Sequence, residues 1–337
     1  MNQQLIDRFP GISCAWADAA GKETIEYYGF SDRESHAPVN EKTIFPACSI
    51  SKFITAICIM KLQEQKLIDI DMPVNQYLRQ WKLLTADGAE SNAAIRSILC
   101  HTAGIVDGED SFYGLRMGDP EISLMDILEG RTSYNSRPVR AEKPQGTAFE
   151  YSDAGYCVLQ LLMEDVTQKA FDECVREILF DPLGLSSAFF ATPGNITRFE
   201  NRMATGYDDN GRSIPGRFPR VPDLAASGLW STPKELLVIA KGFIHALNGE
   251  RSFLRPDSAQ EMAKPGKDFS WTGLGIFNSG ENILSSSGWG ENGQCMMKMN
   301  CRTREISVAM TNRNPGADQA ESGIDGLVNS KLAARQS

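Results

Sequence analysis

The chain has 337 residues and a formal net charge of −9, with 42% hydrophobic and 23% charged positions. This apolar content is enough for a packed core and excludes a disordered chain. The acidic balance supplies no electrostatic footprint for nucleic acid or an anionic membrane surface, and no apolar run reaches the ~18 residues that span a bilayer. We therefore expect no nucleic-acid partner and no membrane partner. Residues 1–8 lack a basic head followed by an apolar stretch, so we expect a cytoplasmic location unless a leader has been removed.

The cysteine and histidine content argues against a disulfide scaffold or a metal site. The eight cysteines form no Cys-x-x-Cys pair, and the three histidines are far apart in the chain. Zinc sites need closely spaced ligands of these types. We expect free, mostly buried thiols, no metal and no cofactor.

Strand signals lie at the two ends of the chain. β-Branched and aromatic residues alternate over 11–17 and 23–30 around a Gly turn, which predicts a hairpin. Towards the other end, Gly and Asn turns separate four more predicted strands, at 271–278, 282–287, 294–299 and 305–311. A final helix is predicted over 318–335.

The middle of the chain has helical periodicity. Apolar residues recur every three or four positions in six segments: 51–65, 92–100, 123–128, 153–167, 171–180 and 233–247. The last helix has a clear start, with Thr232 as N-cap, Pro233 at the first helical position and Glu235 completing a capping box.

This order of elements predicts an α+β fold with two lobes. Residues 1–45 and 268–337 form a discontinuous sheet lobe, and residues 46–267 form a mainly helical lobe. The cleft between them is the expected site. Long loops rich in Gly, Pro, Asp and Asn shape its mouth, at 107–119, 135–146 and 191–222.

A serine and a lysine at the start of an apolar helix are the first candidates for chemistry. Ser49 and Lys52 are three apart, so both lie on one helix face, and a desolvated lysine can take a serine proton. The helix N-terminus also favours an oxyanion. The alternative is an ordinary N-cap serine with a snorkelling lysine. A second Ser-x-x-Lys begins at Ser231, where the helix start at Pro233 explains it.

Two further segments carry candidate groups. Tyr151-Ser152-Asp153 stands just before a predicted helix, where a tyrosine near a lysine can shuttle a proton. Its alternative is a tyrosine packed beside a capping residue. The small residues of 285–293 let a backbone N–H approach a substrate carbonyl, or they form only a Gly-rich hairpin.

The order and spacing of these motifs resemble the penicillin-recognising serine hydrolases, in the branch of class C β-lactamases, D-Ala-D-Ala carboxypeptidases and related (family VIII) esterases. The resemblance covers nearly the whole chain. Besides the three motifs it includes 9–12 (Phe-Pro-Gly-Ile), 43–45 (Thr-Ile-Phe), 98–105 (Ile-Leu-Cys-His-Thr-Ala-Gly-Ile), 181–185 (Asp-Pro-Leu-Gly-Leu), 225–232 (Ala-Ala-Ser-Gly-Leu-Trp-Ser-Thr) and 273–275 (Gly-Leu-Gly).

The resemblance implies a fold and a mechanism. The β-lactamase/transpeptidase-like fold has a five-stranded antiparallel sheet flanked by terminal helices, an all-helical lobe, and the active site between them. The implied chemistry is acyl transfer through a serine ester on a small-molecule substrate. Ser49 is then the nucleophile, Lys52 and Tyr151 the proton-relay pair that titrates as a unit, and the backbone N–H groups of Ser49 and Trp289 the oxyanion hole. His101 is structural in this family, not part of a triad.

Two departures from the family pattern bear on the substrate. Asp153 stands where an Asn is usual, and Ser286 replaces the usual Lys or His of the third motif, before Ser287 and Gly288. We expect Asp153, Ser286, Ser287 and Gly288 to contact substrate, without the cation that recognises a carboxylate. Candidate replacements from loops are Arg212, Arg217 and Arg220, and candidate walls of an apolar acyl pocket are Tyr113, Trp230 and Trp289.

The sequence thus favours a serine hydrolase for an ester or amide bond, with a β-lactam or a D-amino-acid-containing compound among the possible substrates. A β-lactamase or D,D-peptidase proper remains the first alternative. The second is a non-catalytic sensor or binding module that keeps the fold, and Asp153 and Ser286 speak for it. No oligomeric state is predicted.

Overall fold

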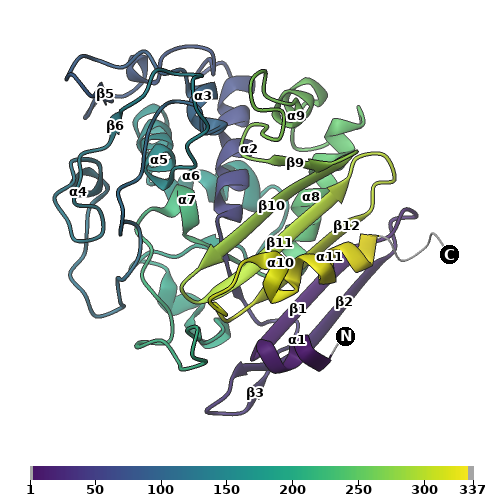
Figure 1. Ribbon diagram of the computed structural model, residues 1–337. Coiled ribbons are helices and arrows are strands. Elements are labelled where there is room, and N and C mark those ends of the chain that lie inside the picture. Colours follow the sequence, from purple (N-terminus) through teal and green to yellow (C-terminus); the bar gives the residue numbers. More distant parts are fainter. Residues whose placement is uncertain (1–2, 333–337) are drawn as a thin grey trace.

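A seven-stranded antiparallel sheet runs through the computed structural model, which describes residues 3–332 (Figure 1). Two predictions fall partly outside the described part: residues 1–2 of the segment 1–8, and residues 333–335 of the predicted last helix. The strand order is β3-β2-β1-β12-β11-β10-β9. The strands are β1 (Gly11–Ala17), β2 (Glu23–Asp32), β3 (Ala37–Pro38), β9 (Phe277–Gly280), β10 (Ile283–Gly290), β11 (Gly293–Asn300) and β12 (Ile306–Thr311).

The α+β class is confirmed, but the expected number of five strands is wrong. Five of the six segments predicted as strands form the middle of the sheet, and β3 and β9 extend it at its two edges. A two-residue strand such as β3 is too short for a periodic signal, and Pro38 fits an edge because it has no N–H to donate. The predicted strand at 271–278 turns back on itself instead, since Asn278 N–H donates to Trp271 O, and β9 starts only at Phe277.

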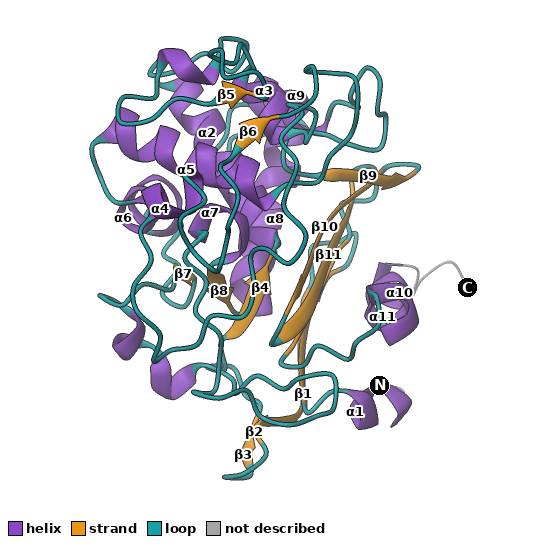
Figure 2. Ribbon diagram, turned by 60° about the vertical axis from the view of Figure 1, so that its left-hand side comes forward, coloured by secondary structure: helices purple, strands orange, loops and turns teal. Residues whose placement is uncertain are grey.

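Both faces of the sheet are covered. Side chains alternate along each strand, so Ile12 and Ala309 pack against the terminal helices, while Ala15 and Val308 face the main core. Figure 2 shows the terminal helices on one side of the sheet and the remaining helices on the other. The terminal helices are α1 (Gln3–Arg8), α10 (Gln319–Ser322) and α11 (Ile324–Leu332). The single helix predicted here is broken at Gly323, whose φ of 91° ends α10.

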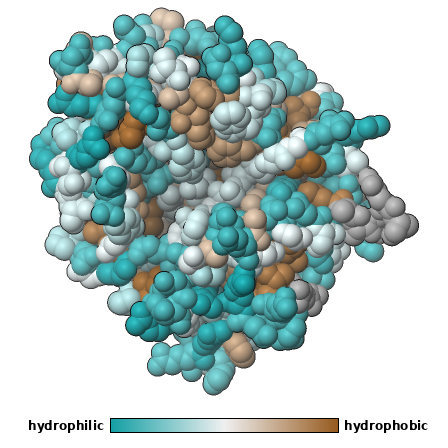
Figure 3. All heavy atoms as spheres, in the orientation of Figure 1, coloured by the Kyte–Doolittle hydropathy of each residue, from teal (hydrophilic) through white to brown (hydrophobic). Residues whose placement is uncertain are grey.

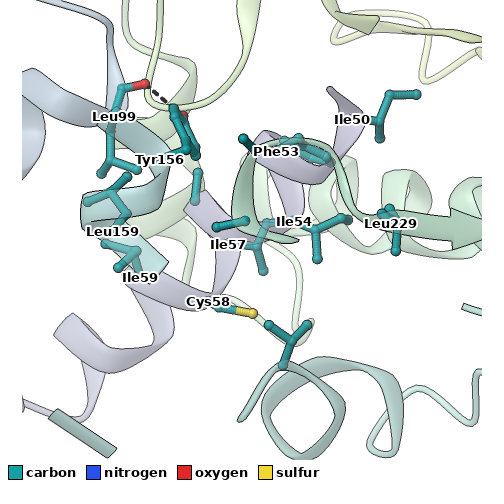
Figure 4. Packing of buried hydrophobic residues seen from close by; sticks show 14 of the residues in the cluster. Ile50, Phe53, Ile54, Ile57, Cys58, Ile59, Leu99, Tyr156, Leu159 and Leu229 are labelled. Atoms are coloured by element: carbon teal, nitrogen blue, oxygen red, sulfur yellow. Dashed lines mark hydrogen bonds between the residues drawn. The ribbon is translucent and has the colours of Figure 1, made fainter. Parts of the chain in front are cut away.

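The helices between the two strand blocks build the main core around α2 (Ile50–Glu64). This helix is buried on nearly every side, as expected for a helix that is apolar all round (Figure 4). The others are α3 (Ile95–Leu99), α4 (Leu124–Leu128), α5 (Asp153–Thr167), α6 (Phe171–Val175), η2 (Arg176–Phe180), α7 (Leu224–Ser227), α8 (Pro233–Leu247) and α9 (Pro256–Ala263). Within residues 3–332 no helix is long and apolar enough to cross a membrane.

Short elements connect these helices. A small sheet has the order β4-β8-β7, and β5 pairs with β6 in parallel. The elements are η1 (Val74–Gln76), η3 (Ile196–Arg198), η4 (Glu200–Arg202), β4 (Phe45–Cys48), β5 (Leu84–Thr85), β6 (Arg140–Ala141), β7 (Phe189–Phe190) and β8 (Leu229–Ser231). The division into lobes at residues 45 and 268 stays a prediction.

The start of α8 follows the sequence only in part. Thr232 is the N-cap, and its hydroxyl accepts the N–H of Glu235 at 3.2 Å, which confirms the predicted cap. The predicted second half of the capping box, in which the Glu235 side chain would accept the Thr232 N–H, is wrong. The Glu235 carboxylate accepts the N–H groups of Ser186 and Ser187 instead, which ties α8 to the segment before β7.

Replacing the N-cap side chain tests this reading of α8. Thr232→Ala removes the acceptor for Glu235 N–H, so we expect the free energy of unfolding to fall by about 1 kcal/mol. Thr232→Ser keeps an oxygen at the same place and should unfold like the wild type. Urea titrations of the three proteins measure the difference, and equal midpoints for Thr232→Ala and wild type would contradict the capping role.

Candidate active site

Ser49 lies at the sharp turn from β4 into α2. The residue before it, Cys48, has a φ of 46°, in the left-handed region that non-glycine residues rarely occupy. Such strain persists only where the surrounding structure enforces it, and it is typical of functional turns. Ser49 is the N-cap of α2, but its side chain makes no capping hydrogen bond. The hydroxyl is therefore free for another role, unlike that of an ordinary N-cap serine.

Lys52 reaches back from the first turn of α2 to the Ser49 hydroxyl. Its Nζ donates to Ser49 Oγ at 3.2 Å, to Asp153 Oδ1 at 2.5 Å and to the Ala226 carbonyl at 3.0 Å. An ammonium group can only donate hydrogen bonds, and these acceptors surround it. Burial of Lys52, whose side chain is 4% exposed, acts to lower its pKa, but the Asp153 carboxylate outweighs this effect and holds the pKa above its ordinary value. Lys52 is thus a cation at neutral pH.

Tyr151 closes the site from the loop before α5. Its ring lies 4.8 Å from Lys52 Nζ, and its hydroxyl hydrogen-bonds with Ser49 and Lys52. The side chain as a whole is 43% exposed, so its outer edge borders the cleft. Burial of the hydroxyl raises the pKa of Tyr151 in spite of the nearby ammonium. Of the two proton arrangements considered for the pair, the resting structure has a cationic Lys52 and a neutral phenol.

His101 supports Tyr151 from beneath. The two rings stack at 4.4 Å between centroids, and His101 Nδ1 accepts the backbone N–H of Ser152 at 3.1 Å. Burial, with a smaller effect of Lys52, lowers the pKa of His101 well below its usual 6.5. The ring is therefore neutral and acts as an acceptor, which agrees with a structural role.

The N-terminus of α5 is held by a second carboxylate. Asp107 accepts the Ser152 hydroxyl at 2.7 Å and the N–H groups of Asp153 and Ala154 at 2.7 and 3.1 Å. These bonds satisfy helix N–H groups that otherwise have no partner. They also fix the start of α5, so that the Asp153 side chain meets Lys52.

Asp223 is an ionisable residue near Asp153 that sequence reasoning missed. It is completely buried at the start of α7, where its Oδ1 accepts the Tyr134 hydroxyl at 2.5 Å and its Oδ2 has no hydrogen-bond partner. Burial and the nearby Asp153 carboxylate raise the pKa of Asp223 to about 8. The protein therefore holds this acid in its neutral form at pH 7. Asp223 lies two residues before the 225–232 motif, but no residue pattern around Asp223 identifies it as part of the site.

Strand β10 brings the third motif against the nucleophile turn. A Cβ on Gly288 would lie 2.4 Å from Ala47 O and 2.8 Å from Cys48 Cβ, so only glycine allows this approach. In the β10–β11 pair, Gln294 N–H and C=O both bond the Thr311 hydroxyl on the β12 side. Trp289, which lies opposite Gln294, is therefore in a non-hydrogen-bonded pair. The Trp289 N–H points to the edge of β10 that faces away from β11.

The other predicted substrate contacts lie along the same strand. Ser286 is buried on the face of β10 that Gly288 shares, and Ser287 is half-buried. Trp289 directs its indole outward, with 46% of the side chain exposed and Nε1–H bonded to Asn314 at 2.7 Å. Contact of these groups and of Asp153 with substrate stays a prediction.

None of the three candidate loop arginines contacts Ser49, Tyr151 or Asp153 in residues 3–332. The three candidates bond elsewhere: Arg212 to Asp208, Arg217 to Thr205 and Met203 O, and Arg220 to Asp119 O. Lys52 is the one ammonium or guanidinium group in this described part that contacts Ser49, Tyr151 or Asp153. The site is therefore poor in positive charge.

The 107–119 loop borders the far end of β10. Glu291, in the β10–β11 turn, accepts the Gly114 N–H at 2.7 Å and pairs with Arg116 at 2.8 Å. Two of the aromatic residues expected in an acyl pocket have contacts outside the catalytic groups. Tyr113 is exposed and bonded to Asp110, and Trp230 is buried against Phe218.

The neutral state of Asp223 gives a pH-dependent prediction. Between its ordinary pKa of 3.8 and about 8, the folded protein keeps a proton on Asp223 that the unfolded chain has lost. This group therefore makes stability fall as pH rises, by roughly 1 kcal/mol per pH unit. Asp223→Asn keeps an acceptor for Tyr134 and removes the titration. Urea unfolding at pH 5.5, 6.5 and 7.5 should show the free energy of unfolding of Asp223→Asn rising relative to that of wild type at each step. The same difference between the two proteins at all three pH values would contradict the assignment.

Parts of the chain are similar in sequence to proteins named as a hydrolase and an esterase. The chain is 28% identical over 236 residues to the unguisins hydrolase ungD' of Aspergillus campestris, covering 67% of this chain and 42% of the relative. It is 29% identical over 188 residues to esterase EstB of Burkholderia gladioli, covering 54% of this chain and 46% of the relative. The chain thus spans less than half the length of these relatives.

Solved structures and the family model confirm the predicted β-lactamase/transpeptidase-like fold over nearly the whole chain. The D-amino acid amidase of Ochrobactrum anthropi has a TM-score of 0.79 at 20% identity, over 98% of this chain and 97% of that one. An octameric penicillin-binding protein homologue from Pyrococcus abyssi has a TM-score of 0.76 at 21% identity, over 99% and 77%. The family model described as Beta-lactamase matches residues 2–327, so the chain belongs to the β-lactamase family.

Proposed function

We propose that this protein is a serine hydrolase that cleaves an ester or amide bond of a small molecule through an acyl-enzyme at Ser49. One observation carries the proposal. The Ser49 hydroxyl does not cap its helix and instead accepts a hydrogen bond from the buried ammonium of Lys52. A structural serine at a helix start would not need a buried cation beside it, whereas a nucleophile needs a group that handles its proton.

Acylation begins with attack of Ser49 Oγ on the substrate carbonyl carbon. The serine proton passes to the Lys52–Tyr151 pair, which can accept it because Lys52 gives one of its own protons to the Asp153 carboxylate, 2.5 Å from its Nζ. The same pair returns a proton to the departing alcohol or amine as the carbonyl–leaving-group bond breaks. The product of this step is a Ser49 ester.

Charge on the carbonyl oxygen develops next to two backbone N–H groups. One is that of Ser49 at the start of α2, and the other is that of Trp289, on the edge of β10 turned away from β11. Preorganised N–H donors of this kind stabilise a tetrahedral intermediate. Water then attacks the acyl-enzyme along the same path and releases the acid.

An uncharged substrate fits the site better than one with a carboxylate near the scissile bond. Lys52 is neutralised by Asp153, and Ser286 supplies no charge where the family usually has a cation. An esterase or amidase function is therefore favoured over a β-lactamase or D,D-peptidase proper. The names of the relatives agree with this, since EstB is an esterase and the amidase acts on D-amino acid amides. A cytoplasmic location stays a prediction.

Intact-protein mass spectrometry tests the nucleophile. Wild type exposed briefly to a p-nitrophenyl ester should gain the acyl mass or release p-nitrophenol continuously, and Ser49→Ala should do neither. Ser231→Ala, in the other Ser-x-x-Lys segment, is the matched control and should behave like wild type. A parallel incubation with a penicillin should label wild type more weakly than the ester does.

Each outcome of this experiment is informative. Turnover by wild type that survives in Ser49→Ala would move the nucleophile elsewhere. No labelling and no turnover with either reagent would favour the non-catalytic binding module. Stronger labelling by the penicillin would favour a β-lactamase or D,D-peptidase.

A further inference from the structure

A group of aromatic side chains lies beside the proposed active site. It consists of Phe149, Phe269, Trp271 and Phe277, here called the aromatic patch. Their ring centroids are 5.3 to 6.4 Å apart in the pairs Phe269–Trp271, Phe149–Trp271, Phe149–Phe269 and Phe149–Phe277. Trp271 is 48% exposed, which is high for a residue that proteins usually bury. Figure 3 shows hydrophobic surface on this face of the molecule, in the area between α3 and β9.

The patch is continuous with the catalytic groups. Phe149 is two residues before Tyr151, and the His101 ring on which Tyr151 stacks lies 5.7 Å from Phe149 and 6.4 Å from Phe277. A row of rings therefore leads from the hydroxyl that hydrogen-bonds Ser49 to the exposed indole of Trp271. Exposed apolar surface that adjoins a catalytic centre marks a binding site more strongly than isolated surface residues do.

The edge of β10 runs in the same direction. β9 pairs with β10 only from Ile283 to Ser285, so the Trp289 end of this edge has no strand beside it. Phe277 pairs with Ser285, four residues from Trp289, which corresponds to about 13 Å along the strand. A substrate whose carbonyl lies at the Trp289 N–H is thus within reach of the patch if it carries a group of several carbon atoms.

The patch is also open on its outer side. Phe269 forms part of the wall of a neighbouring cavity of about 870 Å³, which the other three patch residues do not line and whose wall also carries charged residues such as Arg96, Glu261 and Lys267. The space around Phe269 is therefore not filled by other segments of the chain. The four patch side chains themselves carry no charge, so the group that fits them is apolar.

We propose that the aromatic patch binds an extended apolar group, alkyl or aryl, of the ester or amide substrate and sets the specificity of the site. This proposal rests on the proposed hydrolase function and adds its substrate class. Trp271 and Phe149 make the main contacts, because Trp271 offers the most exposed surface and Phe149 connects it to Tyr151. Burial of an apolar group against these rings lowers the free energy of the bound transition state.

Three methyl or acetate esters test the proposal by titration of the released acid. Methyl octanoate and heptyl acetate are isomers that place the apolar chain on the acyl or the alcohol side, and methyl acetate has no such chain. Wild type should prefer at least one long ester over methyl acetate in kcat/KM. In Trp271→Ala this preference should fall about tenfold, as expected for the loss of one aromatic contact. Trp271→Phe should keep most of it.

A matched control and a binding measurement separate this proposal from the hydrolase function. Phe30→Ala removes another exposed aromatic side chain, on β2, and should keep the preference of wild type. In the Ser49→Ala protein, methyl octanoate or heptyl acetate should shift the tryptophan emission saturably to shorter wavelength, and Trp271→Ala in that background should remove the shift.

The outcomes are distinct. If the long ester binds through Trp271 but wild type hydrolyses no ester, the hydrolase function fails and the patch stands. If wild type hydrolyses esters without preference for a long chain, or if the preference survives in Trp271→Ala and Phe149→Ala, the patch proposal is overturned while the function stands.

Discussion

The ion pair between Lys52 and Asp153 is the interaction on which the site depends. An ammonium group buried this deeply is costly unless acceptors surround it. Here three acceptors come from three different elements: Ser49 at the start of α2, Asp153 at the start of α5 and Ala226 in α7. The charge therefore joins three parts of the fold that are far apart in sequence, and it fixes the Ser49 hydroxyl among them.

The pair also sets the charge state of its surroundings. Asp107 and Asp223 both lie near Asp153, and burial together with this neighbour raises the pKa of each. Asp223 responds by staying neutral, so its carboxyl adds no negative charge beside the Lys52–Asp153 pair at pH 7. A carboxylate substrate would add an uncompensated negative charge here, which is why the balance favours uncharged esters and amides.

Much of the fold could be predicted from the sequence because its signals are local. Periodicity predicted α2, α5 and α8 within a few residues, and alternation predicted the five central strands. The edge strand β3 was missed and β9 was predicted too early, at 271–278, because two to four residues carry too little pattern. Thr232 was predicted as a cap from its neighbours, whereas the bond of Glu235 to the Ser186 and Ser187 N–H groups depends on tertiary structure.

The candidate site likewise has features that local sequence predicts and features that depend on tertiary structure. The i to i+3 spacing of Ser49 and Lys52 on one helix is local, and the structure brings the two groups to 3.2 Å. The direction of Asp153 towards Lys52 depends on how α5 packs beside α2, which no spacing reveals. Asp223 is 70 residues beyond Asp153, and the strain at Cys48 belongs to the turn between β4 and α2. Such features follow only from the folded chain.

The titration of Lys52 tests the central claim most directly. NMR of protein labelled at the lysine Cε carbon reports the protonation of each ammonium group, and Lys52→Arg identifies the Lys52 signal. In wild type, Asp153 should keep Lys52 protonated to a pH well above the ordinary lysine range, and in Asp153→Asn its pKa should fall because burial then acts without the opposing carboxylate. The same Lys52 pKa in both proteins, or a neutral amine at pH 7 in wild type, would contradict the account.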